Sequence, residues 1–413
     1  MGIDLEHLLV TKQRAALYVV VYYPFTNQTC FGNYAFTLFE AKFPWPRHNA
    51  SEGSQVLVGI PVAFCGRRVP HSLHHFNMTP NPNKSSLEEF HLQVKTSVVS
   101  EKPEKIEIVY VNVFIYAAYH LFAIYGLYLS FTSVKWPTII LGVILWTLSV
   151  LGTTMGSHRL WSHRAYKAKL PLQILLMICT SIACQLTSYN WVRDHRMHHK
   201  YSDTNADPHN AKRGFFFSHM GWLFIKKHSE MKRLGNTIYM DDVHSNPVLM
   251  FQKKYAIPFM GSLCFIIPVL IPMYFWNETF VNAWNFNILR FILGVHSICS
   301  INSFAHLWGS RPYDENIMPV ENMGVSLVTL GEGFHNYHHS FPWDYKAGEL
   351  GNNWLNLSTS TIDFFAKLGW AYDLKTASGE VVEARIKRTG DGTYKREVFK
   401  ENDRRKKEKN IGQ

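Results

Sequence analysis

The chain has 413 residues, 47% of them hydrophobic and 15% aromatic, with 42 Lys and Arg against 31 Asp and Glu. The apolar residues are gathered in long blocks between basic segments, which is typical of a membrane protein beside anionic lipid; beyond a basic tail, nothing suggests nucleic-acid binding. The six cysteines contain no Cys-x-x-Cys pair, so no disulfide framework is indicated.

The first part of the chain, residues 1–104, is predicted to be an extension without an assigned role and partly disordered. Its apolar stretch ALYVVVYYPF, at 16–25, is too short to span a bilayer, and the later part is rich in Pro, Asn and Ser. The string HSLHH, at 71–75, has the spacing of a histidine cluster, but it lies in this polar stretch without an adjoining span. We interpret it as coincidental.

Apolar blocks predict transmembrane helices, because a helix needs about 20 apolar residues to cross a bilayer core of about 30 Å. The predicted spans cover about 110–131, 136–155, 256–276 and 286–305. The last includes Arg290 and His296, which must face protein or water because they are costly in lipid. A further stretch, 170–186, is interrupted by Gln and Ser and predicts a buried or interfacial helix.

The distribution of Lys and Arg predicts the orientation, because these residues favour the cytoplasmic side. The connections at 132–135 and 277–285 hold one Lys between them, whereas the loop between the second and third spans and the C-terminal tail are basic. Both termini are therefore predicted to be cytoplasmic. We expect a membrane domain at 105–375 and a basic cytoplasmic tail at 376–413.

Three histidine motifs lie at or near the ends of these blocks: HRLWSH at 158–163, HRMHH at 195–199 and HNYHH at 335–339. On a helix, residues i, i+3 and i+4 share a face, so His-x-x-His-His is expected to direct three imidazoles to one point. Eight histidines exceed the four ligands of a tetrahedral zinc and indicate two metal ions, whose identity imidazole alone leaves open. A structural zinc site and a transport path are alternatives; against transport, the motifs lie outside the spans.

Longer strings around these motifs carry a family resemblance. WVRDHRMHHKYSDTNADPHNAKRGFFFSHMGW at 191–222, NSFAHLWGSRPYD at 302–314 and GEGFHNYHHSFPWDY at 331–345 resemble the integral-membrane acyl-CoA desaturases of animals, with the insect enzymes most similar. The resemblance runs from about residue 105 to residue 394. We expect an all-α membrane protein with four transmembrane helices and a helical cytoplasmic cap that holds a histidine-rich di-metal centre.

The resemblance also implies the metal and the reaction. Two non-haem irons are expected, with Asn302 acting through water; overexpressed protein is expected to accept zinc as an artefact. The implied reaction uses O2 and two electrons to place a cis double bond in a saturated fatty acyl-CoA. The implied ligand histidines are His158, His163, His195, His198, His199, His306, His335, His338 and His339.

Nearby carboxylates are candidates to accept the second N–H of a ligand histidine, which would fix its tautomer. We expect this role for one or two of Asp194, Asp203, Asp207, Glu332 and Asp344.

Substrate contacts are implied in the same way. The phosphates of CoA are expected to meet basic side chains, and the implied contacts are Arg193, Asp194, Lys226, Lys227 and Asn112. The implied wall of the acyl tunnel is Gln185, Trp191, Ile298 and Cys299. Ile298 and Cys299 stand where vertebrate relatives carry Thr and Trp, so the chain length and the double-bond position are left open.

The chain contains no fused cytochrome b5 motif and no nicotinamide site, so electrons must come from a partner. The resemblance implies cytochrome b5 and its NADH-dependent reductase, in the endoplasmic reticulum membrane. Two alternatives stay open: a membrane di-iron fatty-acyl hydroxylase, which would yield an alcohol, and a non-catalytic membrane protein that binds metal without consuming O2.

Overall fold

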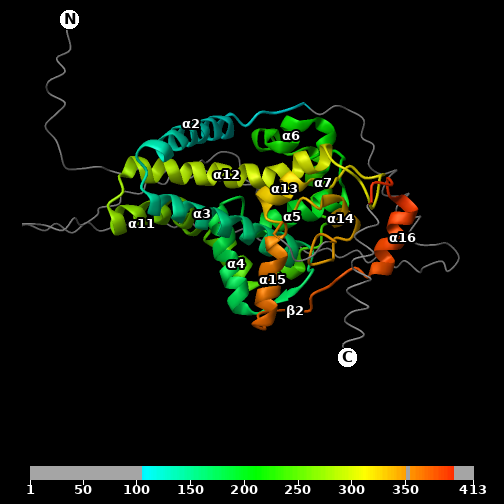
Figure 1. Cartoon of the computed structure of the whole chain (residues 1–413). Helices are drawn as coiled ribbons and strands as arrows, with labels where there is room; N and C mark the ends of the chain where they lie inside the picture. The colour runs from blue at the N-terminus through cyan, green and yellow to red at the C-terminus, as the bar shows by residue number, and fades with distance from the viewer. Residues whose placement is uncertain (1–104, 350–353, 395–413) are drawn as a thin grey trace, which may run out of the picture. The chain divides into compact units, whose positions relative to one another are not determined.

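The computed structural model describes residues 105–349 and 354–394, which are mostly helical (Figure 1). The N-terminal extension with its HSLHH string and the end of the predicted tail, residues 395–413, lie outside the described residues. In the described part, four helices are long and apolar enough to cross a membrane: Tyr110–Thr132, Trp136–Ser162, Ala256–Trp276 and Phe280–Leu307. This confirms the predicted fold class.

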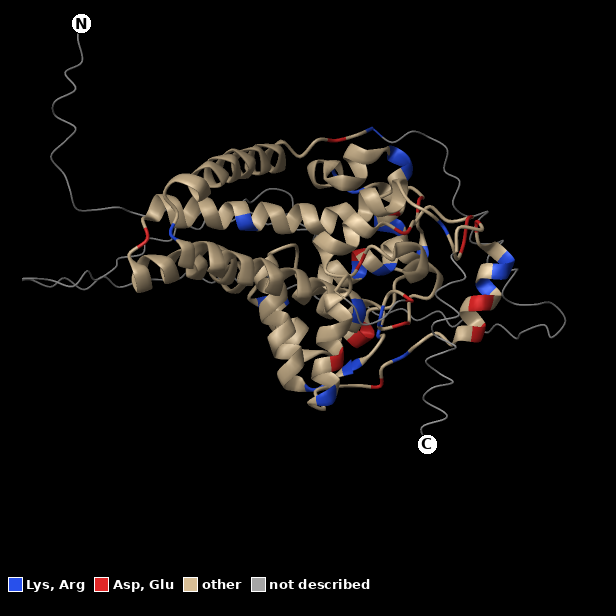
Figure 2. Cartoon of the chain, viewed as in Figure 1, with Lys and Arg blue, Asp and Glu red and all other residues tan. Residues whose placement is uncertain are grey.

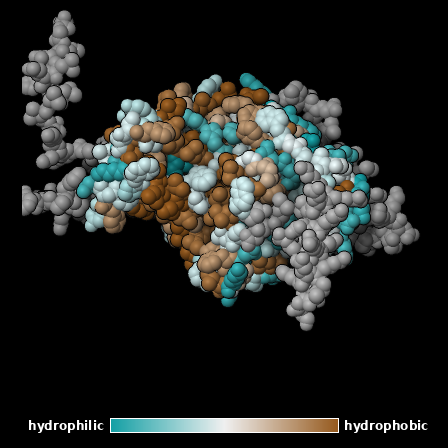
Figure 3. Space-filling model, in the orientation of Figure 1, coloured by the Kyte–Doolittle hydropathy of each residue, from teal (hydrophilic) through white to brown (hydrophobic). Residues whose placement is uncertain are grey.

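The first and last of these spans are the single helices α2 (Tyr110–Thr132) and α12 (Phe280–Leu307). The second consists of α3 (Trp136–Leu151) and the π-helix η2 (Gly152–Ser162), and the third of α10 (Ala256–Gly261), the π-helix η5 (Ser262–Ile266) and α11 (Ile267–Trp276). Figure 3 shows hydrophobic residues over much of the visible face of these helices. Figure 2 shows that the charged residues lie mostly away from the α11 end of the spans, on the side of the molecule where Figure 1 labels α7, α14 and α16.

Two spans extend beyond the apolar blocks that predict them. The second continues to Ser162 rather than residue 155, and the fourth begins at Phe280 and ends at Leu307. Every residue of η2 is buried, so its polar side chains face protein rather than lipid. Hydropathy cannot distinguish these two environments, and this is why the predicted ends fall short.

Helix α12 lies between α2 and α3 (Figure 1), and small residues allow both neighbours to approach it. A Cβ atom at Gly126 of α2 would lie 2.3 Å from the carbonyl oxygen of Asn285, and one at Gly142 of α3 would lie 2.4 Å from the ring of Phe286. Just before the first turn of α12, Glu278 accepts hydrogen bonds from the hydroxyl of Thr138 (2.7 Å) and from the backbone N–H of Lys135 (2.9 Å). These contacts hold α2 and α3 closely against α12 and the residues before it.

Residues 163–255, 308–349 and 354–394 form the part that we call the cap. Two short strands, β1 (Lys167–Ala168) and β2 (Ala371–Tyr372), pair antiparallel and join its two halves. Its helices are α4 (Leu170–Ala183), α5 (Ser188–Lys200), η3 (Ala211–Arg213), α6 (Phe215–His219), η4 (Gly221–Phe224), α7 (Ser229–Gly235), α8 (Asp241–His244), α9 (Pro247–Lys254), α13 (Met323–Thr329), α14 (His335–Ser340), α15 (Leu357–Lys367) and α16 (Gly379–Thr389).

The predicted helix at 170–186 corresponds to α4, which ends at Ala183 and is followed by a sharp bend. The axes of α4 and α5 differ by 84°. Helix α5 begins anew because the side chain of Thr187 accepts a hydrogen bond from the N–H of Asn190, which is a standard N-cap. The bend brings α5, with its histidines, against η2.

Candidate metal centre

Nine histidines converge in two groups where η2, α5, α12 and α14 meet. In each group, the candidate ligand atoms all lie within 4.8 Å of one another. The first histidine group consists of His158, His163, His195, His199 and His338. The second histidine group consists of His198, His306, His335 and His339.

The π-helix explains the spacing of the first motif. In a π-helix, the N–H of one residue bonds to the carbonyl five residues earlier, so residues five apart lie one above the other. The N–H of His163 lies 3.2 Å from the carbonyl oxygen of His158, and both imidazoles reach the first group. The pattern His-x-x-x-x-His therefore fits η2, whereas an α-helix would turn the two side chains apart.

The two His-x-x-His-His motifs divide their histidines between the groups rather than directing all three to one point. On α5, His195 and His199 belong to the first group and His198 to the second. On α14 the assignment is reversed, since His335 and His339 belong to the second group and His338 to the first. In each motif, residues four apart share a group, as the α-helical repeat requires.

The nitrogen distances in the first group fit a bound cation. The Nε2 atom of His338 lies 3.0 Å from the Nε2 atoms of both His158 and His199, and those of His163 and His195 are 2.8 Å apart. A single N–H cannot satisfy two such contacts, whereas one cation would bind all the lone pairs. With metal–nitrogen bonds of about 2.0–2.1 Å, ligands at right angles lie about 3.0 Å apart, and tetrahedral ligands about 3.4 Å.

The second group fits in the same way. The Nε2 atom of His335 lies 3.1 Å from the Nε2 atoms of both His306 and His339. The Nε2 atom of His198 is buried and has no hydrogen-bond partner in the described residues. Burial of such an atom is costly unless something binds it, and a metal ion would.

Carboxylates lie beside the second ring nitrogen of several of these histidines. His158 Nδ1 lies 3.0 Å from Glu332 Oε2, and His198 Nδ1 lies 2.9 Å from Asp207 Oδ1. A proton on Nδ1 leaves Nε2 free as a ligand atom. Asp203 lies 3.8 Å from His306 Nδ1, whereas Asp194 and Asp344 contact no histidine of either group in the described residues.

The protein environment favours the neutral imidazole, the form that binds metal, for most of these histidines. His198 is the exception, since burial would lower its pKa but the charge of Asp207 outweighs burial and raises that pKa. Burial, together with the neighbouring histidines, lowers the pKa well below 6.5 for His163, His195, His199, His335, His338 and His339. Burial would raise the pKa of Glu332, but the charges of Arg159 and His158 outweigh it and lower that pKa to about 2. The pKa of Asp207 is likewise about 2, because His198 outweighs burial.

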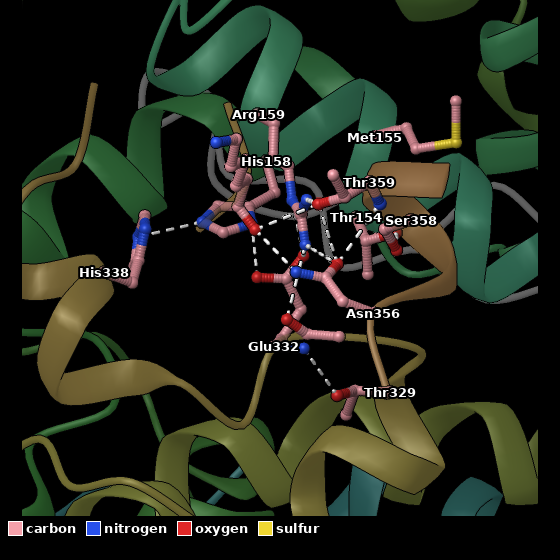
Figure 4. A network of polar contacts seen from close by, with 12 residues as sticks. Thr154, Met155, His158, Arg159, Thr329, Glu332, His338, Asn356, Ser358 and Thr359 are labelled. Atoms are coloured by element: carbon pink, nitrogen blue, oxygen red, sulfur yellow. Dashed lines mark hydrogen bonds and ion pairs between the residues drawn. The ribbon is translucent and has the colours of Figure 1, made fainter. Parts of the chain in front are cut away.

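An arginine that the sequence analysis did not assign supports this arrangement (Figure 4). Arg159 is 1% exposed and donates to Glu332 (3.0 Å) and to Thr359 (2.9 Å). It thereby joins η2 to the loop before α14 and to α15. Arg159 lies beyond the predicted end of the second span at residue 155, so the one signal in the sequence is its place directly after His158.

The predicted CoA contacts gather near the start of α2. Asp194 is buried and pairs with Arg193 (2.9 Å) and Lys227 (2.5 Å). Burial would raise the pKa of Asp194, but these two cations outweigh it and lower that pKa. Lys226 pairs with Glu107, and the Asn112 side chain donates to the carbonyl of Leu223 at 2.7 Å.

The predicted tunnel residues lie on α5, in the bend before it and on α12. Trp191 stacks on His195 with ring centroids 4.7 Å apart. Gln185 lies in the bend after α4, where its amide is 4.0 Å from the position that a Cβ of Gly294 would take. Ile298 and Cys299 are buried on α12, and Asn302 precedes His306 by one turn of the same helix.

The fold and the paired histidine groups define a multi-pass membrane protein with a site suited to two metal ions. Comparison with known proteins gives the particular family. Residues 134–357 match the family model described as fatty acid desaturase. The chain is 59% identical to an acyl-CoA Delta(11) desaturase of Spodoptera littoralis over 289 residues, which are 70% of this chain and 86% of that protein.

Two proteins of Acheta domesticus are also similar. The chain is 52% identical to an acyl-CoA Delta-9 desaturase over 294 residues (71% of this chain, 82% of the relative). It is 50% identical to an acyl-CoA Delta12-desaturase over 295 residues (71% of this chain, 83% of the relative). The chain therefore belongs to the fatty acid desaturase family and is an acyl-CoA desaturase, an oxidoreductase that introduces double bonds into fatty acyl-CoA. The predicted family and activity are confirmed, and the double-bond position is not fixed, because relatives with different positions match.

Proposed function

We propose that the two histidine groups bind two iron ions and that the chain uses O2 and two electrons to place a cis double bond in an acyl-CoA. The observation that carries this proposal is the convergence of nine largely buried histidines in two groups, in each of which the candidate ligand atoms lie within 4.8 Å of one another. Imidazole is a suitable ligand for iron. The bound metals would supply the oxidant that removes hydrogen from an unactivated methylene.

The chain's own residues have separate tasks in this proposal. The nine histidines hold the metals, with Asn302 placed to act through water from one turn before His306. Glu332 and Asp207 keep the Nδ1 protons of His158 and His198 in place and so orient these rings. Burial of the groups excludes bulk water, which protects the reaction from side products.

The substrate head group fits the basic cluster near the start of α2. Arg193 and Lys227 are held by the buried Asp194, and both remain about a quarter exposed, at 23% and 28%. Pre-positioned cations bind phosphates with little loss of side-chain freedom. We infer that these residues, with Lys226 and Asn112, bind CoA, and that the acyl chain passes Trp191 and Gln185 toward Ile298 and Cys299.

The electron donor that we propose is cytochrome b5, which an NADH-dependent reductase would recharge. The histidine groups lie at the C-terminal ends of η2, which continues α3, and of α12, and basic loops follow them. This supports an orientation with the cap in the cytoplasm. An acidic carrier protein would be attracted to such a surface. The corresponding location is the endoplasmic reticulum membrane, with both termini cytoplasmic.

Expression in a yeast that lacks its own desaturase tests the proposal. Mass spectrometry of derivatised fatty acids should find new cis alkenes, and purified protein should contain iron in both groups. His338→Ala should abolish the products, whereas His244→Ala, on a histidine outside both groups, should not. Hydroxylated chains would favour the hydroxylase alternative, and iron binding without any new lipid would favour a non-catalytic metal-binding protein.

A further inference from the structure

A buried arginine inside α12 has no acidic partner. Arg290 is 3% exposed, and none of the ion pairs within residues 105–349 and 354–394 includes it. Its guanidinium instead donates to the carbonyl oxygens of Ile182 (3.1 Å) and Cys264 (2.8 Å). A third acceptor is the side-chain oxygen of Asn287, at 2.8 Å. A charged donor placed so deep in a membrane span normally has a specific task.

Both backbone acceptors lie at irregular points of their helices. Cys264 lies in the π-helix η5, four positions before Pro268, which has no N–H, and its carbonyl accepts both from Arg290 and from the side-chain amide of Asn287, at 2.9 Å. In an α-helix, the carbonyl of Ile182 would accept from residue 186, which lies beyond the end of α4. In lipid such carbonyls are costly to leave without a partner, and Arg290 bonds to both.

The bend that Arg290 supports is conformationally demanding. Cys184 and Leu186 have φ angles of 50° and 69°, a left-handed conformation that side chains other than glycine rarely adopt. The opposite side of the bend is held by Gln252 of α9, which accepts from the N–H of Ser188 at 2.8 Å. The turn from α4 to α5 is therefore fixed between α12 on one side and α9 on the other.

This bend leads directly to the metal centre. It contains Gln185, and α5 begins immediately after it, with Trp191 stacked on His195 of the first histidine group. Arg290 stands two turns before Ile298 on α12. The guanidinium thus sets the distance between two walls of the acyl path, if the acyl chain follows the course given under Proposed function.

We propose that Arg290 is a positioning residue that sets which methylene pair of the acyl chain lies beside the histidine groups. Removal of its contacts lets the bend shift, and a displacement by the length of one carbon–carbon bond brings a neighbouring methylene into place. The predicted consequence is a change in the position of the double bond rather than a uniform loss of turnover. This inference rests on the proposed acyl path.

The test uses the full chain in the same yeast, with the ratio of double-bond positions as the readout. Arg290→Gln should raise the share of alkenes with a displaced double bond about tenfold, because hydrogen bonds from a charged donor are lost. Arg290→Lys, which keeps the charge, should raise it less.

Asn282→Ala is the matched control, because Asn282 is a buried polar residue of α12 that bonds to Ser133 and Glu278, far from the bend. It should leave the ratio unchanged. The proposal is overturned if the Arg290 variants keep the wild-type ratio and lose only turnover, if Asn282→Ala shifts the ratio equally, or if no Arg290 variant accumulates in the membrane. A wild-type chain that forms no alkene removes the proposed function itself, which is a separate and recognisable outcome.

Discussion

His158 and His338 are separated by 180 positions in the chain, yet their Nε2 atoms lie 3.0 Å apart. One imidazole comes from the π-helix at the end of a membrane span, and the other from a short helix of the cap. Their contact joins the second membrane span to the cap at the first histidine group. A bound cation between them would therefore also stabilise the fold, since metal binding and folding are coupled.

The carboxylate beside His158 should tune metal affinity. Glu332→Gln removes the charge that faces His158 and Arg159, and we expect metal affinity at the first group to fall about 10- to 100-fold. Metal titration of the purified protein measures this. Asp344→Asn is the control, because the Asp344 carboxylate accepts from Tyr337 and from the backbone N–H groups of Lys346 and Ala377 and pairs with no histidine of either group. Equal losses in both variants would contradict the assigned role.

The stability of the metal-free protein should fall as the pH drops below about 6.5. The buried histidines have pKa values well below 6.5 in the folded protein, so the unfolded chain binds more protons in that range. Each such histidine contributes a loss of about 1.4 kcal/mol in total between pH 7.5 and 5.5, and the slope approaches about 1.4 kcal/mol per pH unit at lower pH. Thermal unfolding in detergent between pH 7.5 and 5.5 measures the slope, and His335→Gln should make it shallower. A melting temperature independent of pH would count against neutral histidines.

The glycine before Glu332 should be intolerant of a side chain. Gly331 has φ of 129°, and a Cβ there would lie 2.3 Å from the side-chain oxygen of Asn356, which bonds to Arg159. Gly331→Ala should therefore destabilise the protein by about 2–3 kcal/mol and loosen the loop that carries Glu332. Chemical denaturation in micelles provides the measurement. Gly379→Ala, where a Cβ meets nothing within 4 Å, should have little effect.

The basic cluster should act on substrate binding rather than on the chemical step. Lys227→Ala removes one of the two cations that pair with Asp194, and we expect KM for acyl-CoA to rise about tenfold with kcat nearly unchanged. Assays with purified protein and varied acyl-CoA separate the two constants. Lys212→Ala, on an exposed lysine of η3, is the control. A fall in kcat alone would assign Lys227 to another task.

The sequence by itself determined the class of protein. Long runs without charge can only be accommodated in a bilayer or a large core, so four spans could be predicted, and the histidine motifs with their flanking strings indicated the family. Local spacing also explains why His195 and His199, one helical turn apart, share a group. These features depend on neighbours in the chain, and so they are visible without a structure.

Tertiary structure decided what depends on distant residues. The tertiary structure decided which histidine belongs to which group. It also brought Arg159 to Glu332 and Arg290 to Ile182, although these partners are more than a hundred residues apart in the chain. The π-helical form of η2 also arises there, because its polar side chains are stable only when the cap buries them. Hydropathy and local periodicity report the chain's own preferences, whereas burial and pairing are set by whatever the fold places alongside.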